Sequence, residues 1–299
     1  MAKALKFKPI FKFLLELHPP AAWLVLVLSV MVTSWAWYVS DKAVTQTIEE
    51  RFGFQSQDLA TAITERMKEY ELVLRSGAAL FDASNAVTRS DWNSFADTIY
   101  LHKYFPGIQA LGYSVMLTPQ ELSAHIETIR QEGFSDYTVS PEGVREQYSA
   151  IQFIEPFDWR NQRAFGYDMY AEPIRKEAMD RARDTGKPAT SGRVTLVQET
   201  NEDVQYGFLM YYPVYHEHMP LDYVEDRRQA LRAYVYAAFR MRDLMYGILG
   251  QAQGQLEFAI YDGAEANTDA VLYSSDKRQQ GITQDSEAAF TDFHSLDIA

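Results

Sequence analysis

The chain has 299 residues, of which 47% are hydrophobic, and its formal net charge at pH 7 is −13. This length allows one large or two modest domains, and the hydrophobic content excludes a disordered chain. The acidic balance argues against a nucleic-acid partner, because phosphate recognition needs a basic surface, and the absence of cysteine excludes disulfides and thiolate chemistry.

An uncharged segment near the start, residues 19–40, is predicted to be a transmembrane helix. It reaches the roughly 20 residues that a helix needs to cross a bilayer, and Trp23 and Trp35 lie towards its two ends, where interfacial aromatic residues belong. Lysines in residues 1–18 predict a cytoplasmic N-terminus and place residues 41–299 outside the inner membrane, in the periplasm if the source is Gram-negative. The alternative is a cleaved signal peptide, but bulky aromatic residues stand where small cleavage-site residues should be.

The next segment, residues 41–80, has the apolar pattern of a helix and contains no proline. We predict a stalk helix that pairs with a copy of itself, forms a core helix of the following domain, or does both. The apolar stripe is not a strict heptad, so no coiled coil is predicted. Its apolar residues recur at spacings of three and four: Leu59, Ile63, Met67, Tyr70 and Leu74.

Residues 81–219 mix helix and strand patterns and predict an α+β domain. Thr118 and Glu121 form a capping box that begins a helix after the strand 108–117. Pro173 begins another helix, which Gly186 ends in the left-handed conformation that glycine favours.

Strands are expected on both sides of the helix that begins at Pro173, at residues 166–170 before it and at 191–200 and 204–215 after it. A charged linker, residues 220–228, then leads to a second, smaller α+β unit. The sequence therefore predicts a domain boundary at 219/220, with the smaller unit at 220–299.

No arrangement of residues typical of catalysis or of metal binding is found. His216 and His218 lie two residues apart in a polar loop and are interpreted as solvated side chains. There is neither a nucleophile elbow nor a glycine-rich phosphate loop. We therefore predict no catalytic residue, no metal and no cofactor for this chain.

Four long segments that follow the transmembrane helix closely resemble the CHASE domain in sequence and order. CHASE domains are extracytoplasmic sensory modules of membrane histidine kinases and nucleotide cyclases, including the plant cytokinin receptors. The resemblance covers about residues 50–275. The segments are YFPGIQALGYSV, YSAIQFIEPFDWRNQRAFGYDMYAEPIRKEAMDRARDTGKPATSGRVTLVQE, YGFLMYYPVY and YVYAAFRMRDLM.

The resemblance implies an α+β architecture in which a stalk helix precedes two PAS-like domains. The membrane-distal domain, residues 81–219, would bind a small molecule, and residues 220–299 would form the smaller membrane-proximal domain. The chain would then be the non-catalytic input region of a homodimeric histidine kinase or diguanylate cyclase/phosphodiesterase whose output domain lies beyond Ala299. The alternatives are a membrane-anchored extracytoplasmic partner-binding protein and a membrane-anchored hydrolase.

Asp168 is the first candidate for a ligand contact. In the cytokinin-receptor branch, an aspartate on the matching strand receives hydrogen bonds from the ligand, and a carboxylate in an apolar pocket needs such a partner. Gly166, on the same strand face, would leave room for a ligand with N–H donors or a positive charge. Leu196 and Tyr211, on the two following strands, and Tyr113 are the further ligand-binding candidates.

The alternative is an internal role for Asp168. Its carboxylate would then pair with an arginine such as Arg163 or Arg193, or it would cap the helix 173–185.

Overall fold

The computed structural model describes residues 19–84, 86–200, 202–250, 256–263, 265–275, 290–296 and 298. The chain divides into two units, the first containing residues 1–57 and 290–292, the second containing residues 58–289 and 293–299.

A long helix, α2 (Pro19–Asp82), begins in the first unit and continues into the second. Its apolar part has a mean hydropathy of 1.8 over 18 residues and is not buried against the protein. Within the part of the chain that the structure describes, α2 alone is long and apolar enough to cross a membrane. The expected transmembrane and stalk segments, 19–40 and 41–80, are therefore parts of one uninterrupted helix.

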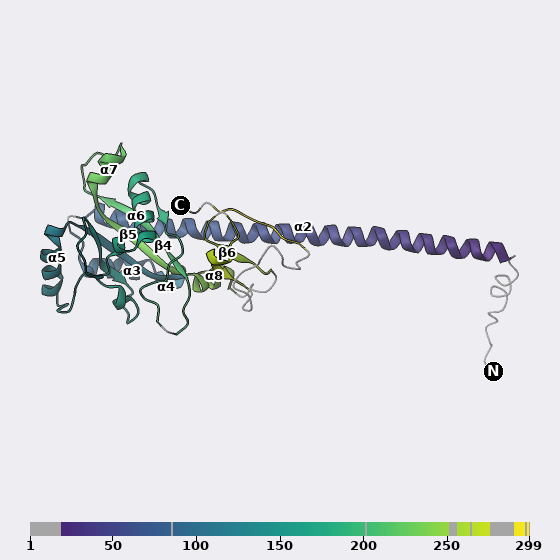
Figure 1. The fold of residues 1–299 in the computed structure, drawn as a ribbon, viewed down its shortest axis with the longest axis horizontal. Coiled ribbons are helices and arrows are strands. Elements are labelled where there is room, and N and C mark those ends of the chain that lie inside the picture. The colour runs from purple at the N-terminus through teal and green to yellow at the C-terminus, as the bar shows by residue number, and fades with distance from the viewer. Residues whose placement is uncertain are drawn as a thin grey trace. The chain divides into compact units, whose positions relative to one another are not determined.

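The second unit is built on a five-stranded antiparallel sheet with the strand order β2-β1-β5-β4-β3. Figure 1 labels the neighbouring strands β5 and β4 of this sheet. Two further strands form a separate small sheet. The strands are β1 (Ile108–Leu117), β2 (Tyr148–Glu155), β3 (Ala189–Thr190), β4 (Gly207–Tyr215), β5 (Leu231–Arg240), β6 (Ala259–Tyr261) and β7 (Val271–Ser274).

The central strand, β5, corrects the expected boundary at 219/220. β5 pairs with β1 on one side and β4 on the other, so it completes the sheet formed by the preceding strands. A boundary before it would leave β1 and β4 without the strand that joins them. The sequence shows the charged linker 220–228, but it does not show which strands pair across that linker.

Helices cover both faces of the sheet, and each face has its own hydrophobic cluster. Along β5, Val235 contributes to the cluster under α2, α3 and α8, whereas Tyr234 and Tyr236 contribute to the cluster under α6, as the twofold alternation of a strand requires. The helices are α3 (Arg89–Thr98), α4 (Leu101–Tyr104), α5 (Pro119–Gln131), α6 (Pro173–Thr185), α7 (Val224–Ala230) and α8 (Met241–Leu249), with short 3-10 helices η1 (Asn161–Ala164), η2 (Met169–Ala171) and η4 (Thr268–Ala270).

The capping predictions for the helices that begin at Pro119 and Pro173 are confirmed. Glu121 accepts a hydrogen bond of 2.9 Å from the backbone N–H of Thr118 at the start of α5. Gly186 ends α6 with φ at 69°, and Pro173 is its first residue. These ends were predictable because each depends on a few neighbouring residues.

Two predicted strands are wrong. Residues 166–170 form only isolated bridges, at Tyr167 and Asp168, before η2 begins at Met169, where the carboxylate of Asp168 accepts the N–H of Tyr170 and so competes with further strand pairing. Residues 191–200 contain no strand beyond an isolated bridge at Val194: β3 ends before them, at Thr190, and the backbone turns where the N–H of Glu199 donates to the carbonyl of Leu196.

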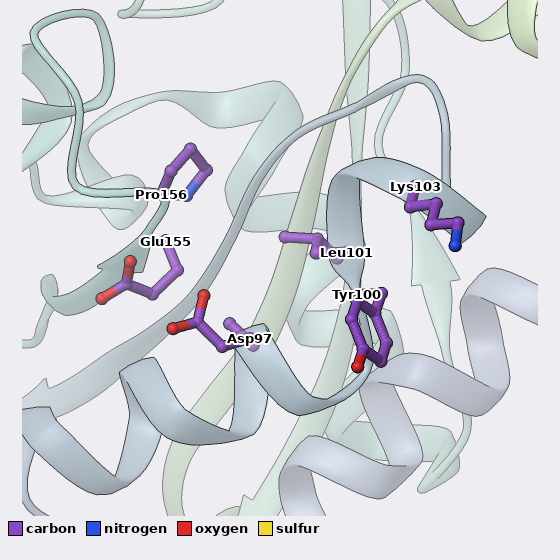
Figure 2. A pocket seen from close by; sticks show the side chains of 7 residues that line it. Asp97, Tyr100, Leu101, Lys103, Glu155 and Pro156 are labelled. Carbon is purple, nitrogen blue, oxygen red and sulfur yellow. The ribbon is translucent and has the colours of Figure 1, made fainter.

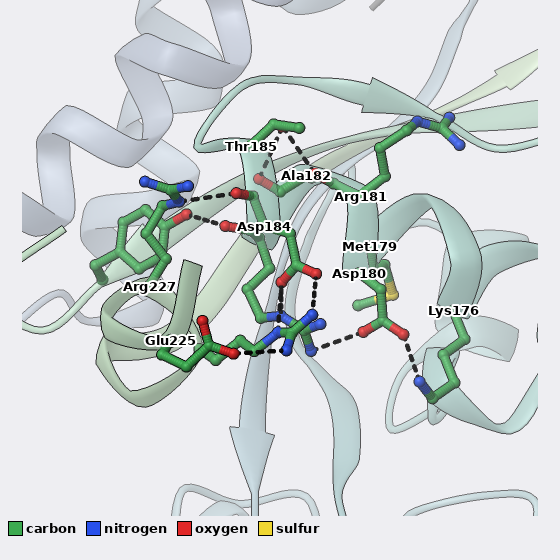
Figure 3. Close-up of polar contacts among 12 residues, drawn as sticks. Lys176, Met179, Asp180, Arg181, Ala182, Asp184, Thr185, Glu225 and Arg227 are labelled. Carbon is green, nitrogen blue, oxygen red and sulfur yellow. Dashed lines mark hydrogen bonds and ion pairs between the residues drawn. The ribbon is translucent and has the colours of Figure 1, made fainter. Parts of the chain in front are cut away.

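A polar cluster joins α6 to α7 (Figure 3). Asp184, near the end of α6, accepts hydrogen bonds from Arg228 at 2.7 Å and from Arg183 at 2.6 Å. Hydrogen bonding to Arg228, with a further contribution from Arg183, lowers the pKa of Asp184 from 3.8 to about 2.

Replacing Asp184 with asparagine is therefore expected to destabilise the protein at neutral pH by about 1 kcal/mol, a value reduced for the solvent exposure of this cluster. Because the folded pKa lies below the unfolded one, the stabilisation is present above the unfolded value of 3.8 and is lost as the pH falls towards 2. Urea unfolding of both proteins across this range measures the difference, with Asp222→Asn as an exposed control. If the difference in unfolding free energy between the two proteins did not change with pH, the stabilisation could not come from the ionised carboxylate of Asp184.

Candidate functional site

A small cavity lies in the face of the sheet that α6 covers. Its wall includes Arg175 of α6, Tyr236 of β5, and Leu196 and Gln198 of the irregular segment 194–198. Its volume of about 10 Å³ is close to the space that one water molecule needs.

Two tyrosines on neighbouring strands have buried hydroxyl groups without partners, and one of them, Tyr236, is part of the cavity wall. Tyr211 of β4 and Tyr236 of β5 are directly opposite in the strand register, and their ring centroids lie 6.4 Å apart. Both side chains are fully buried, and neither hydroxyl has a hydrogen-bond partner among the described residues. Burial raises the pKa of both hydroxyls, so they are neutral donors at physiological pH.

Gly112 of β1 makes room for one of these rings. A Cβ atom at position 112 would lie 2.5 Å from the ring and hydroxyl atoms of Tyr236, much closer than van der Waals contact allows. The position of the Tyr236 hydroxyl therefore depends on the absence of a side chain at 112.

Arg175 brings a positive charge to the same place. It is 3% exposed, and its guanidinium lies 4.8 Å from the ring centre of Tyr167. One terminal nitrogen donates to the carbonyl of Thr195 at 3.2 Å, whereas Nε has no partner among the described residues. The cavity wall thus combines one cation and the Tyr236 hydroxyl, both available to donate hydrogen bonds, and Tyr211 lies beside Tyr236 outside the wall itself.

Asp168 is fully buried, but it is not part of the cavity wall. Its Oδ1 accepts hydrogen bonds from the backbone N–H groups of Ser149 at 2.8 Å and Tyr170 at 3.0 Å. Its Oδ2 forms an ion pair with Arg145 Nη1 at 3.4 Å but has no hydrogen-bond partner among the described residues. Burial raises the pKa of Asp168, and the two N–H groups and Arg145 partly offset this.

Asp168 therefore has partners within the protein, as the alternative interpretation of the sequence expected. These partners differ from the ones that interpretation proposed. Arg145 takes the place expected for Arg163 or Arg193. Asp168 caps η2, whereas α6 is capped by Glu172.

The other candidates from the sequence separate into two groups. Leu196 lines the cavity and Tyr211 lies beside Tyr236, so the structure brings these two together. Tyr113 belongs to the cluster on the opposite face of the sheet, where its ring stacks on Phe81 at a centroid distance of 3.9 Å.

Sequence reasoning did not select Arg175 or Tyr236. The spacing of α6 contained a signal for the first, since Arg175 shares a helix face with Ala178, Met179 and Ala182, all of which are buried. For Tyr236 the signal was weaker, because Tyr234 and Tyr236 occupy equivalent positions on the same face of β5 and the pattern does not distinguish them.

A second depression, open to solvent and about 230 Å³ in volume, lies between the end of α3, α4 and the end of β2 (Figure 2). The carboxylates of Asp97 and Glu155 face the same space, and burial raises the pKa of Glu155. Glu155 already accepts the N–H of Phe157 at 3.2 Å, and no group of three metal-ligating side chains occurs in the part of the chain that the structure describes. This depression therefore has weaker features of a binding site than the cavity at Arg175.

Among solved structures, one described as "Methyl-accepting Chemotaxis protein X" is similar to this chain, with a TM-score of 0.37 and 12% sequence identity. The similarity covers 67% of this chain and 65% of that one, less than two thirds of the latter's length. At this TM-score it supports no conclusion about the present chain.

The sequence model of the CHASE domain matches residues 85–273, which is more than half of the chain. The match contains β1 to β5, α6 and every residue of the cavity wall named above. The chain therefore belongs to the CHASE domain family, the extracytoplasmic small-molecule-sensing domains of signalling receptors.

Proposed function

We propose that this chain is the ligand-sensing input region of a membrane-anchored receptor, with its ligand bound at the cavity beside α6. The observation that carries the proposal is that two residues of the cavity wall have buried polar atoms without partners, Arg175 Nε and Tyr236 Oη. Each such atom costs about 1–3 kcal/mol of folding free energy. A ligand that hydrogen-bonds to them would recover part of that cost and stabilise the protein by mass action.

The architecture supports a receptor in which the N-terminal part of α2 spans the membrane and the sheet unit lies outside the cell membrane. We assign the five-stranded sheet to a PAS-like membrane-distal domain and the small sheet of β6 and β7, with α8, to the membrane-proximal part. The output would be a histidine kinase or a diguanylate cyclase/phosphodiesterase, and the receptor would be a homodimer paired through α2.

Signal transmission would use the continuity of α2. The residues of this helix from Ile63 to Phe81 pack on the face of the sheet opposite the cavity, against the same strand β5 that carries Tyr236. A ligand that binds two arrangements of these elements unequally would shift the population between them.

Replacing Tyr236 with phenylalanine tests the site, because it should change stability and binding in opposite directions. Removing a buried hydroxyl without a partner is expected to leave the ligand-free protein as stable as before or to stabilise it by up to about 1 kcal/mol. The same change should weaken the thermal stabilisation produced by a specific ligand. The measurement is the melting temperature of the full chain in detergent, with a small-molecule panel that includes purines, amines and amino acids.

Tyr234→Phe is the matched control on the same strand. The Tyr234 hydroxyl donates to the carbonyl of Met179 at 2.9 Å and lies 3.2 Å from the Tyr170 hydroxyl, so its loss should destabilise the ligand-free protein. The proposed site is wrong if Tyr236→Phe destabilises the ligand-free protein as Tyr234→Phe does, or if it leaves every ligand response unchanged.

A further inference from the structure

We infer that the ligand of this cavity presents an anionic oxygen group, most simply a carboxylate, to Arg175. This inference rests on the proposed function and adds the chemical class of the ligand. It replaces the expectation of a cationic ligand, which depended on Asp168 facing the pocket.

The first argument is the charge of Arg175. Two arginines are buried in the part of the chain that the structure describes, and they differ in their partners. Arg240, 7% exposed, has Glu199 at 2.7 Å and Asp243 at 2.8 Å. Arg175, 3% exposed, has no carboxylate within 4.0 Å among the described residues. A buried cation without a counter-charge is costly, so an anion from outside the chain is the expected partner.

The second argument is the position of Arg175 at the start of α6. It is the third residue of this helix of 13 residues, where the backbone N–H groups already carry partial positive charge. Glu172 accepts the N–H groups of Ile174 at 3.2 Å and of Arg175 at 2.9 Å, so its carboxylate is engaged with the helix end. A basic side chain at this end of a helix is unfavourable by itself. A bound anion would offset both the charge of Arg175 and the partial positive charge of the helix end.

The third argument concerns hydrogen-bond direction. The guanidinium can only donate, so the missing partner of Arg175 Nε must bring lone pairs. Tyr236, which lines the same cavity, can donate to the same group. A carboxylate offers about four acceptor sites in a plane that matches the guanidinium, which makes it the ligand group that best fits the donors of Arg175 and Tyr236.

The size of the cavity determines the probes. Because there is room for only about one water molecule, every carboxylate requires some movement of the wall, and we select the smallest ones because they require the least. A larger ligand requires movement of segment 194–198, which forms part of the wall.

The test measures the melting temperature of the full chain in detergent with formate and acetate at constant ionic strength. Formamide and acetamide serve as neutral compounds of matched size. We expect a saturable increase with the carboxylates and none with the amides. In Arg175→Gln the apparent affinity should fall by roughly tenfold or more, because a charge-assisted bidentate pair is lost, and Arg175→Lys should retain part of it. Arg181→Gln is the control: this exposed arginine of α6 also donates to a backbone carbonyl, that of Thr190 at 2.6 Å.

Each outcome decides between the two proposals. An equal response to acetate and acetamide, or an acetate response unchanged in Arg175→Gln, overturns the inference. If another compound stabilises the protein through Tyr236 but independently of Arg175, the proposed function stands and the anionic class is wrong. If neither the carboxylates nor any compound of the wider panel stabilises the protein, both are wrong. If Arg175→Gln does not fold, Tyr236→Phe is the second variant, and it must weaken the acetate response.

Discussion

Replacing Asp168 with alanine is expected to destabilise the protein by about 3 kcal/mol, since the change leaves two buried backbone N–H groups without an acceptor. These are the N–H groups of Ser149 and Tyr170, at 2.8 and 3.0 Å from Oδ1. Arg145 also loses the carboxylate that lies 3.4 Å from its Nη1. The measurement is the free energy of unfolding in urea at neutral pH.

Asparagine at position 168 separates the hydrogen bonds from the charge. Its side-chain oxygen can still accept both N–H groups, so Asp168→Asn should lose less stability than Asp168→Ala. Comparing Asp168→Asn with the original protein also shows whether the negative charge stabilises or destabilises the fold, because only the carboxylate ionises.

The pH dependence follows from the raised pKa of Asp168, which burial causes. When the folded pKa lies above the unfolded one, the stabilisation is complete below the unfolded value and is lost as the pH rises through the folded one. The free energy of unfolding of the asparagine variant, relative to that of the original protein, should therefore be higher at pH 7 than at about pH 4, which is near the ordinary pKa of an aspartate. The opposite trend would mean that the attraction to Arg145 outweighs the cost of burial.

These expectations change how Asp168 should be used in functional tests. A loss of ligand response in Asp168→Ala would accompany a large loss of stability, so it would not identify a ligand contact. Tyr236 and Arg175 provide the cleaner test, because each has a matched control on its own element, Tyr234 and Arg181.

The features predictable from the sequence are those that depend on neighbouring residues. The capping box at Thr118, the proline and glycine that bound α6, and the long apolar helix all follow from local patterns. The family was recognisable because its motifs are long and keep their order.

The features that were missed depend on residues far apart in the chain. The central position of β5 depends on pairing with β1, more than 100 residues earlier, which no local pattern encodes. The same holds for Arg175: its sequence position shows that it faces inwards, but its lack of a carboxylate partner appears only when β4, β5 and segment 194–198 are in place. For Asp168, a buried carboxylate was correctly expected to need partners, and the tertiary structure supplies them from Ser149 and Arg145.

Replacing Gly166 with alanine is expected to destabilise the protein by roughly 3–5 kcal/mol, as a steric conflict with backbone is added to an unfavourable dihedral angle. The sequence suggested that this glycine leaves room for a ligand, but the structure fills that space with the carbonyl oxygen of Thr138. A Cβ atom at 166 would lie 2.2 Å from that oxygen, and φ at 166 is +81°. The surrounding backbone cannot easily yield, since Gly166 bonds to Ser140 through its carbonyl and to Ile151 through its N–H, each at 3.0 Å.

Gly133→Ala isolates the steric part of this effect. Gly133 also has a positive φ, +107°, but a Cβ atom there would meet nothing within 4 Å. Its replacement should therefore cost only the dihedral strain, about 1 kcal/mol. Urea unfolding of the two variants gives the difference, which reports the contact with the Thr138 carbonyl. Equal losses would show that segment 138–140 can move away from Gly166, and the bridge between Ser140 and Tyr167 would then be a flexible part of the region around Asp168.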